Sequence, residues 1–491
     1  MPDLGPLVPS ILLTVAALAV LLTDLLGRGR RPVVPAVLAI AGFVTAGLVA
    51  WGQAPDTAVV FGVLRADAFG LAMTVFCCLV GALTVVATMR GEAFRTPGGE
   101  YLLLILAAVL GMIILSMSVD LVTLYLAFET VSIPSYVLVG MRRSDLKANE
   151  ASMKYVLFGA VSSAAMLYGL SLLVGLVGST SLDALSVAMT NGIGAQPIFW
   201  VACVLMAAGF AFKISAVPFH FWAPDVYAGA PAAVGGFLAV ASKAAGFAAL
   251  IRVVAAVVPG QVAQATGAGW LPDGPFLLQV VGVLAILSMT FGNAAALRQT
   301  EIKRLLAWSS IAHAGYILLA ITVWSDSTLA GLVLYLVAYL FMNLAAFAIA
   351  GMVIRRQGSG EMSAFRGLAR RNVWLAVALA IVMFSLTGLP PFFGFVGKLQ
   401  LFYGVFAKGY IALGVLGLLN GVVSLYYYMR VVTAMFPFSE QEGEEAATAW
   451  RLPLADKLLS AGLVAPVVLF GLFWSPLWEW AKAVTESVIG G

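Results

Sequence analysis

The stretch GGFLAVASKAAGFAALI, residues 235–251, decides how this chain folds. It lies in a run of apolar residues, 232–257, that is long enough to cross a bilayer as one helix, since a spanning helix needs about 20 mostly apolar residues. The only charged residue of the stretch, Lys243, lies near the middle of the run. A lysine there costs roughly 2.5–3.5 kcal/mol on insertion scales, and leucine could fill a packing role without that cost. The stretch therefore predicts a membrane helix whose lysine has a function.

The rest of the sequence has the composition of a membrane protein. Of 491 residues, 62% are hydrophobic and 10% are charged, and the mean hydropathy is +1.02. A soluble domain has about a quarter of its residues charged. Apolar runs follow one another almost from end to end, so we expect an all-α fold and a single polytopic membrane domain over residues 1–491.

The sequence gives no sign of a bound cofactor, metal or nucleic acid. Cys77, Cys78 and Cys203 lie in apolar runs without zinc or iron–sulfur spacing and are expected to be small core residues. There is no dinucleotide-binding fingerprint, Walker loop or haem-type histidine pattern. The net charge of +4 requires no nucleic-acid partner. We expect no cofactor and no metal in this chain.

Apolar runs of spanning length predict about fourteen transmembrane helices. The first run is long and lacks a small-residue cleavage site, so we expect a retained helix rather than a signal peptide. The expected spans are 4–26, 33–51, 67–89, 101–118, 120–141, 151–178, 197–222, 232–257, 276–297, 305–324, 328–354, 373–405, 409–436 and 459–479.

The basic residues predict the orientation of the chain, because loops rich in Lys and Arg stay in the cytoplasm. Only Arg65, Lys408 and Lys482 fall in loops on the opposite side. We therefore expect both termini to lie outside. Eighteen of the 27 basic residues collect in alternate loops on one side, namely Arg28, Arg30, Arg31, Arg90, Arg95, Arg142, Arg143, Lys147, Arg298, Lys303, Arg304, Arg355, Arg356, Arg366, Arg370, Arg371, Arg451 and Lys457.

Six basic residues remain inside the expected spans. Arg252 and Arg430 lie near the ends of their helices, so their side chains are expected to reach the membrane surface. Lys154 lies close to the start of its span, where Glu150 at i−4 could pair with it, and both a structural and a functional role stay open. The six residues are Lys154, Lys213, Lys243, Arg252, Lys398 and Arg430.

Glu129 adds a negative charge near the middle of the span 120–141. A carboxylate and a lysine that interact strongly titrate together, so protons would be bound and released by the pair rather than by either residue. The alternative is a static buried ion pair that holds helices in register.

Two expected spans are interrupted by prolines close to a lysine. In AGFAFKISAVPFHFWAPDVYAGAP, residues 208–231, Lys213 precedes three prolines, and the helix is expected to break near 216–219 because proline removes an amide donor and clashes with the preceding turn. The span 373–405 is too long for one straight helix, and two prolines and several glycines come before Lys398. We expect a discontinuous helix with Lys398 at the break.

The interrupted helices also predict an internal repeat. Interrupted helices at corresponding places in two halves point to a transport site built from inverted repeats. Unwound backbone is tolerated at membrane depth only where it is buried in protein or lines a wet cavity. The repeats would be five-helix blocks formed by spans four to eight, 101–257, and by spans nine to thirteen, 276–436, with 459–479 as a C-terminal span.

Two histidines complete the candidate residues. His220 follows the first break, and His313 lies deep in KRLLAWSSIAHAGYILLA, residues 303–320, among hydroxyl side chains. A histidine inside a helix is most often a packing residue. The depth and the hydroxyl neighbours also fit a proton relay, so both roles stay open.

Five strings of the sequence together resemble a known family, the antiporter-like membrane subunits of respiratory complex I. The resemblance runs from about residue 100 to residue 436, and the number of spans extends it over the chain. The strings are FETVSIPSYVLVG (128–140), EASMKYVLFGAVSSAAMLYG (150–169), FKISAVPFHFWAPDVYAGAP (212–231), IKRLLAWSSIAHAGY (302–316) and SLTGLPPFFGFVGKLQLF (385–402).

The resemblance implies roles for the charged residues. Glu129 and Lys213 are similar to the family's charge pair in the first half-channel. Lys243 is similar to the central lysine that joins the halves, and Lys398 to the terminal lysine of the second half-channel. The residues that match other polar positions along the family's hydrated axis are Lys154, His220 and His313.

The resemblance also implies a function and partners. The chain would move protons as a non-redox subunit of a proton-pumping NADH:quinone oxidoreductase, with quinone reduction taking place in other subunits. Its partners would be the other membrane subunits of complex I, including antiporter-like neighbours, in a bacterial inner membrane. One alternative is a subunit of a multi-subunit sodium–proton antiporter, whose chains share these motifs. Another is a structural spacer with fixed ion pairs and no transport.

Overall fold

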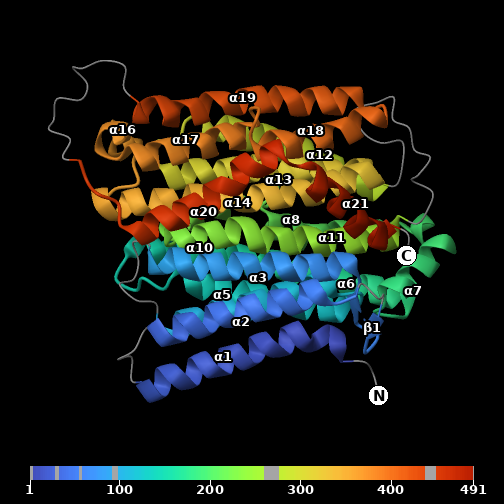
Figure 1. Ribbon diagram of the computed structural model, residues 1–491. Coiled ribbons are helices and arrows are strands. Elements are labelled where there is room, and N and C mark those ends of the chain that lie inside the picture. The colour runs from blue at the N-terminus through green and yellow to red at the C-terminus, as the bar shows by residue number, and fades with distance from the viewer. Residues whose placement is uncertain are drawn as a thin grey trace.

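The computed structural model describes residues 4–27, 33–54, 58–90, 98–258, 276–436 and 449–489. Long helices run side by side across the molecule, as Figure 1 shows, and make up most of the described chain. The prediction of an all-α membrane protein is thereby confirmed. The loop residues Arg28, Arg30, Arg31 and Arg95, on which part of the predicted orientation depends, lie outside the described residues.

Thirteen of the described helices are long and apolar enough to cross a membrane. The remaining predicted span is formed by two shorter helices, α17 and α18, so the prediction of about fourteen spans is confirmed. The thirteen are α1 (Val8–Gly27) with the short η1 (Gly5–Leu7) before it, α2 (Val33–Gly52), α3 (Ala68–Met89), α4 (Gly99–Met117), α5 (Leu121–Val139), α6 (Leu146–Val177), α8 (Pro197–Ile214), the continuous helix of α10 (Ala232–Phe237), η3 (Leu238–Ser242) and α11 (Lys243–Val257), α12 (Phe276–Ala296), α13 (Ile302–Val323), α14 (Asp326–Gln357), α19 (Ile411–Met435) and α20 (Leu454–Leu472).

The first predicted break is confirmed. The helix α8 ends one residue after Lys213, Ser215 takes a left-handed backbone with φ of 58°, and the chain resumes in α9 (Trp222–Gly229). The amide of Val217 lies in the break and has no helical hydrogen bond. It donates instead to Ser288 Oγ on α12 at 3.0 Å. A backbone group at membrane depth must find its partner inside the protein, so the unwound segment is held against α12.

The second predicted break is confirmed as well. α17 (Val373–Thr387) stops at Gly388, whose φ of 91° is a conformation that glycine adopts without strain. α18 (Phe393–Ala407) follows, and the amide of Gly394 in its first turn donates to Ser385 Oγ at 3.0 Å. The two half-helices are therefore held together by a hydrogen bond across the break.

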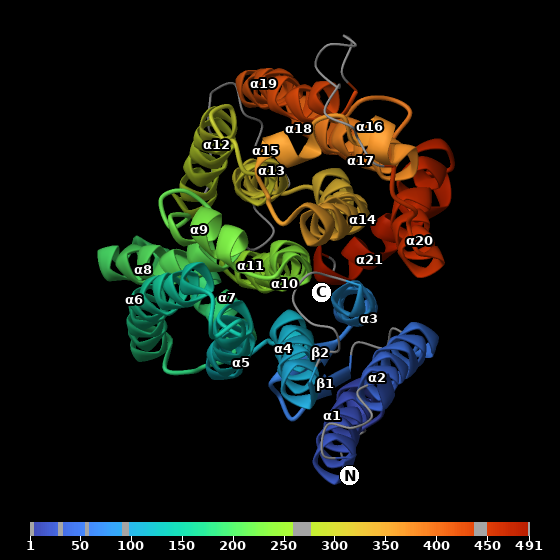
Figure 2. The same ribbon diagram turned by 90° about the vertical axis from the view of Figure 1, so that its left-hand side faces the viewer.

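The continuous helix formed by α10, η3 and α11 lies at the centre of the bundle (Figure 2), packed on α3, α4, α8 and α14. Almost every residue of it is buried. Its middle segment, η3, is a π-helical turn that ends immediately before Lys243. Single π turns inside α-helices occur frequently at functional sites, so the helix geometry singles out the same lysine as the sequence.

The two predicted repeats form neighbouring groups of helices in Figure 2. In the first group α4 packs extensively on α5, and α6 on α8. In the second group α12 packs on α13, and α14 on α18. Helices at the same place in the two halves therefore pair in the same order. The inverted relation between the halves stays a prediction.

The prediction of the last span, 459–479, is wrong in its extent. The helix α20 ends at Leu472, and a separate amphipathic helix, α21 (Ser475–Ile489), follows and packs along α14 and α3. The cause is Pro476, because proline is favoured in the first turn of a helix and disfavoured inside one. Other elements that the sequence did not predict are the antiparallel strands β1 (Ala58–Val60) and β2 (Leu64–Ala66), and the short helices α7 (Leu182–Thr190), η2 (Ile193–Ala195), α15 (Met362–Phe365) and α16 (Leu368–Arg371).

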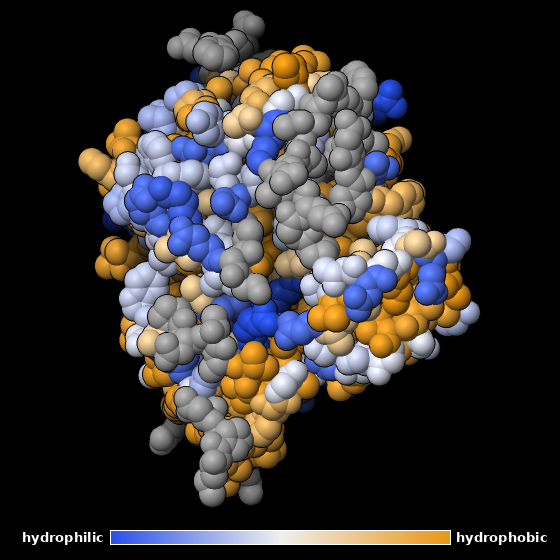
Figure 3. Space-filling view, turned by 90° about the vertical axis from the view of Figure 1, so that its right-hand side faces the viewer, coloured by the Kyte–Doolittle hydropathy of each residue, from blue (hydrophilic) through white to orange (hydrophobic). Residues whose placement is uncertain are grey.

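The sides of the bundle are apolar and its ends are polar. Figure 3 looks onto the end that carries α7, where polar residues gather inside an apolar margin. Large apolar side chains on the outer faces of α6 and α19, such as Val161 and Val422, are exposed. The first described residues of the chain and the end of α21 lie at this same end (Figure 1). The arrangement is that of a multi-pass protein whose sides contact lipid or other membrane chains.

Candidate functional site

The side chain of Lys243 lies in the middle of the molecule and is held only by neutral groups. Its exposed fraction is 3%. Its Nζ donates to the carbonyl oxygen of Ser310 at 3.0 Å and to the Ser310 hydroxyl at 2.5 Å, both on α13. The ring of Tyr227 lies near the same amine, with its centroid 6.0 Å from Nζ. Among the described residues Lys243 has no ion pair, so its proton can leave without stranding a carboxylate.

Lys398 reaches back from α18 to the end of α17. Its Nζ donates to the carbonyl oxygens of Leu386 and Thr387 at 3.0 and 2.9 Å, and it lies 4.8 Å from the centroid of the Tyr316 ring. The last carbonyls of a helix lack partners within the helix and carry its negative dipole end, so they attract a cation. Lys398 itself lies inside α18, and it is its side chain that reaches the predicted break. It also borders a largely apolar cavity of about 490 Å³ between α18 and α19.

His313 lies on α13, within one turn of the serine that holds Lys243. Both of its ring nitrogens are engaged by tyrosines: Nδ1 lies 2.5 Å from the hydroxyl of Tyr335, and Nε2 lies 3.0 Å from the hydroxyl of Tyr428. The Tyr428 hydroxyl is also hydrogen-bonded to Ser309 Oγ. His313 is 2% exposed, so this is a buried polar network rather than a surface contact.

Glu129 and Lys213 lie close together without forming a direct ion pair in the described structure. Lys213 is buried, and its Nζ donates to Ser132 Oγ at 2.9 Å and lies 4.8 Å from the ring centroid of Phe128. The half-buried Glu129 accepts a hydrogen bond from Ser163 Oγ on α6. Glu129 and Ser132 are three residues apart on α5 and therefore share a face. The structure brings the predicted pair to one face of α5 and places a serine between the two charges.

Lys154 belongs to a charged cluster at the end of the bundle that holds most of the basic loops. Its Nζ lies 2.6 Å from Glu150 Oε1 and 2.6 Å from Asp225 Oδ2, and Arg304 also pairs with Asp225. The expected i−4 contact with Glu150 is confirmed. Asp225, which lies between two prolines after the first break, was not among the residues predicted from the sequence. The cluster borders a polar cavity of about 380 Å³ where α6, α9 and α13 meet.

Replacement of Lys154 with alanine is expected to have a small effect. Its side chain is 37% exposed, and ion pairs that solvent reaches contribute only about 0–1 kcal/mol to stability. Proton uptake by membrane vesicles that contain the variant should stay within about twofold of wild type, because a loss of about 0–1 kcal/mol of stability leaves the complex folded and assembled. A loss as large as that expected for the central lysines would place Lys154 among the essential groups.

His220 lies in the unwound segment after α8 and is buried, with an exposed fraction of 4%. Its ring packs against Phe221 and Trp308, at centroid distances of 4.4 and 5.3 Å. Its Nδ1 has no hydrogen-bond partner in the part of the chain that the structure describes. The structure therefore places His220 near α13 but does not connect it to the network around His313.

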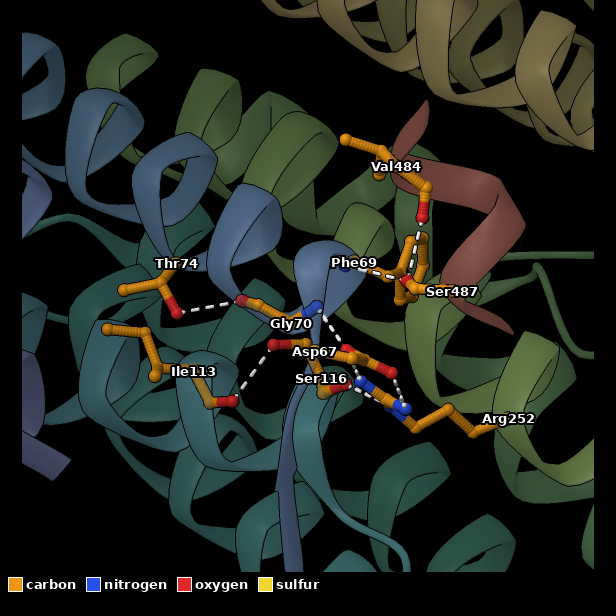
Figure 4. A network of polar contacts seen from close by, with 9 residues as sticks. All are labelled: Asp67, Phe69, Gly70, Thr74, Ile113, Ser116, Arg252, Val484 and Ser487. Atoms are coloured by element: carbon orange, nitrogen blue, oxygen red, sulfur yellow. Dashed lines mark hydrogen bonds and ion pairs between the residues drawn. The ribbon is translucent and has the colours of Figure 1, made fainter. Parts of the chain in front are cut away.

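Arg252 corrects an expectation. The sequence predicts that its side chain reaches the membrane surface, but the side chain is 3% exposed and forms a bidentate ion pair with the fully buried Asp67 on α3, with distances of 2.7 and 3.0 Å (Figure 4). Arg252 Nε also donates to the Ser116 carbonyl at 2.5 Å. Asp67 caps α3 by accepting from the Gly70 amide at 2.8 Å. The β1–β2 hairpin brings Asp67 to this position, and a linear sequence does not show that approach.

Replacement of Asp67 with alanine is expected to destabilise the folded chain by roughly 3–5 kcal/mol, because it leaves the Arg252 charge buried and unpaired. The thermal denaturation midpoint of the purified complex should fall accordingly. The double variant Asp67→Leu/Arg252→Met removes both charges, and we expect it to recover most of the loss. A double variant as unstable as Asp67→Ala would show that the pair acts through something other than its charges.

No metal site is found among the described residues, where no three His, Cys, Asp or Glu side chains group together. Cys77, Cys78 and Cys203 are buried thiols without a disulfide partner within the described ranges. The tyrosines around His313 were not predicted as candidate residues from the sequence. The string SLYYYMR, residues 424–430, was a usable signal, since three consecutive hydroxyl-bearing rings are unusual within an apolar span.

Comparisons with known proteins agree with the resemblance seen in the sequence. Residues 118–424 match the family described as NADH:quinone oxidoreductase/Mrp antiporter, transmembrane. NADH-quinone oxidoreductase subunit N of Anaeromyxobacter sp. (strain Fw109-5) is 40% identical over 506 residues, which cover 98% of this chain and 96% of that protein. A chain of respiratory complex I from Thermus thermophilus with bound aureothin is 32% identical with a TM-score of 0.78, covering 97% of this chain and 99% of that one.

A chain of the Mrp complex from Dietzia sp. DQ12-45-1b shares the fold, with a TM-score of 0.83 at 21% identity over 99% of this chain and 98% of that one. Within the family, the strings SIPSYVLVG (132–140) and EASMKY (150–155) favour subunit N, and relatives that match nearly the whole chain are named subunit N. The chain therefore belongs to the family of NADH:quinone oxidoreductase and Mrp antiporter membrane subunits, and its relatives at about 40% identity there are the proteins named subunit N.

Proposed function

We propose that this chain is the proton-translocating subunit N of an NADH–quinone oxidoreductase. The observation that carries the proposal is the bonding of three buried lysines. Lys213, Lys243 and Lys398 are each held by neutral oxygens, namely a serine hydroxyl, a serine hydroxyl and carbonyl, and two helix-end carbonyls. Arg252 differs from these lysines, because its charge is neutralised by the carboxylate of Asp67 in an ion pair. Lysines without a matched carboxylate are the ones suited to exchanging protons.

The proposed path runs from Glu129 through Lys213, Lys243 and His313 to Lys398. Lys213 packs on α11 at Gly246, one turn from Lys243, because a Cβ at that glycine would stand 3.1 Å from Lys213 Cγ. His313 lies one turn beyond Ser310, which holds Lys243, and its ring is 5.9 Å from the ring of Tyr316, over which Lys398 Nζ lies at 4.8 Å. Each step passes between neighbouring helices inside the bundle, away from lipid.

Electrostatic switching along this path has the magnitude that pumping needs. Moving one charge against the membrane potential requires about 2.3 kcal/mol per 100 mV. A change of three pKa units between two states of a site corresponds to about 4 kcal/mol. Changes in the charge or hydration of one site on the path alter the proton affinity of the next. Such changes in proton affinity are large enough to move a proton in one direction, provided that another process sets the order in which the sites change.

We also propose that quinone reduction in companion subunits drives these changes and that this chain does no redox chemistry. The sequence has no motif for a flavin, haem or iron–sulfur cluster. The partners would be the other membrane subunits of the complex, in contact with the apolar sides of the bundle. The bacterial relatives favour an inner membrane location, and the basic loops favour both termini outside.

The test uses inverted membrane vesicles that contain the intact complex. NADH oxidation by added quinone should drive proton uptake, and replacing sodium with choline should leave the uptake unchanged. The chain should co-purify with flavin and iron–sulfur subunits. Co-purification with antiporter chains alone, together with proton movement driven by a sodium gradient, would instead establish a sodium–proton antiporter subunit, which is the alternative that the shared Mrp fold represents.

A further inference from the structure

The imidazole of His313 is held between tyrosine hydroxyls from two different helices. Tyr335 on α14 contacts Nδ1 and Tyr428 on α19 contacts Nε2, and all three side chains are buried. A neutral imidazole has one donor and one acceptor nitrogen, whereas a hydroxyl can serve as either. Both ring tautomers are therefore satisfied in place, and the ring can change from one to the other without rotating.

On one side of the ring, hydroxyl groups lead toward Lys243. The Tyr428 hydroxyl bonds to Ser309 Oγ, and the next residue of α13, Ser310, accepts the hydrogen bonds of Lys243 Nζ. Two consecutive residues of α13 therefore contact the two ends of this step, Ser310 the central lysine and Ser309 the tyrosine. All four side chains are buried, so a proton that leaves Lys243 in this direction meets hydroxyl groups rather than lipid.

On the other side of the ring, Tyr335 faces the helix that carries Lys398. A Cβ at Gly397 would stand 2.6 Å from Tyr335 Cδ2, so α18 approaches this tyrosine closely at the residue before Lys398. Tyr316, three residues beyond His313 on the same helix, has Lys398 Nζ 4.8 Å from its ring centroid. The two tyrosines therefore contact the histidine on opposite sides, one toward each lysine.

We infer that Tyr428 and Tyr335 are relay residues, and that His313 passes protons between them from one lysine to the other; this inference rests on the proposed function. In the transfer from Lys243, the Tyr428 hydroxyl gives its proton to Nε2 and regains one from the serine side, which Lys243 has supplied. His313 is then an imidazolium. It releases the Nδ1 proton to Tyr335, whose own hydroxyl proton passes to the Lys398 amine.

The proton count of this transfer balances. Lys243 loses one proton and Lys398 gains one, while each hydroxyl gives one proton and receives one. The imidazole ends in its other tautomer, with hydrogen on Nε2 instead of Nδ1. Each bond that breaks leaves its electron pair on the oxygen or nitrogen it belonged to, so no oxidant or reductant is needed. The same groups carry the transfer in the reverse direction.

The neighbouring Tyr427 provides a matched control. It is as buried as Tyr428 and adjacent to it in α19, but its hydroxyl donates to Asn293 Oδ1 on α12 at 3.0 Å. Asn293 in turn donates to the carbonyl and side-chain oxygens of Asn420. Tyr427 thus belongs to a group of amides that joins α12 to α19. Its ring packs on that of Tyr428 at a centroid distance of 4.4 Å, a contact that phenylalanine keeps, and it has no hydrogen bond to His313 in the described structure.

The experiment compares Tyr428→Phe with Tyr427→Phe in the intact complex. Both changes remove one buried hydroxyl from the same turn and keep the ring. Proton uptake is measured in inverted vesicles during NADH oxidation and divided by the amount of assembled complex. We expect Tyr428→Phe to lower it about tenfold or more, the scale of a lost proton-transfer group, and Tyr427→Phe to stay within about twofold of wild type. Tyr335→Phe should behave like Tyr428→Phe.

A double variant separates a relay from a packing role. If Tyr428 acts through His313, Tyr428→Phe should add little to the loss of uptake caused by His313→Ala. Substitutions of residues that act as one unit do not have additive effects. Equal losses in Tyr428→Phe and Tyr427→Phe per assembled complex, or losses that multiply in the double variant, would overturn the relay. If Tyr428→Phe takes up protons like wild type while Lys243→Ala is defective, the relay is overturned but the proposed function stands. If both variants take up protons like wild type, the proposed function is overturned.

Discussion

Replacement of Lys243 with alanine is expected to lower quinone-coupled proton uptake about tenfold or more, the scale of a lost proton-transfer group. The reason is its position: it is the buried amine on the central helix, between the groups that carry Lys213 and Lys398, and no other described amine bonds to Ser310. Assembly should persist, because the lysine holds no carboxylate whose charge would be stranded. The measurement is proton uptake per assembled complex in inverted vesicles, with NADH oxidation followed in parallel.

Two further variants test the reason for that loss. Lys243→Arg keeps a positive charge and hydrogen-bond donors, but arginine does not release its proton at accessible pH, so the uptake should fall as it does for alanine. Lys482→Ala removes a partly exposed lysine that pairs with Glu479 on α21 and should leave uptake unchanged. Normal pumping by Lys243→Arg would show that the position needs only a charge and would contradict proton exchange there.

Replacement of Lys398 with alanine is the second change with a large expected effect, again about tenfold or more in proton uptake. Lys398 bonds to the carbonyls of Leu386 and Thr387, so alanine also leaves two helix-end acceptors without their donor. Each buried group left unsatisfied costs about 1–3 kcal/mol. We therefore expect a lower thermal midpoint of the complex as well as a lower uptake.

The variant Lys398→Gln separates these two effects. The glutamine amide can still donate to a carbonyl at the end of α17, but it cannot carry a proton. The thermal midpoint should then lie closer to wild type than that of the alanine variant, while the uptake stays low. If Lys398→Gln pumped normally, the residue would be a structural cap for the broken helix and nothing more.

The helices and breaks of this fold could be predicted from the sequence because their causes are local. Apolar runs of spanning length set the number of helices, and Pro218 and Gly388 mark the two interruptions within a few residues. A lysine inside an apolar run, such as Lys243, can be recognised from the sequence alone. Burying its charge in the membrane costs free energy whichever residues it contacts in the fold. These features depend on neighbours along the chain.

The pairings could not be predicted, because they join residues far apart in the chain. Arg252 lies near the end of its helix, where a side chain ordinarily reaches water, and only the approach of Asp67 from α3 makes it a buried ion pair. Asp225 joins Lys154 and Arg304 across the two halves in the same way. A resemblance predicts which residues are charged and at which depth. It does not predict that serines rather than carboxylates hold the lysines.

The contact between Asp67 and Arg252 also has a consequence for the order in which the chain is made. The third span leaves the ribosome long before α11, so the carboxylate at its N-terminal end reaches the membrane before its only ion-pair partner in the described structure exists. Until then Asp67 must stay hydrated at the membrane surface, since an unpaired charge is not stable inside. The last helix arrives later still and adds the Ser487 hydroxyl, which accepts from the Phe69 amide at 3.3 Å. The N-terminal end of α3 is therefore completed only after α21 has been made, and a chain shortened before residue 252 would keep that end open to water.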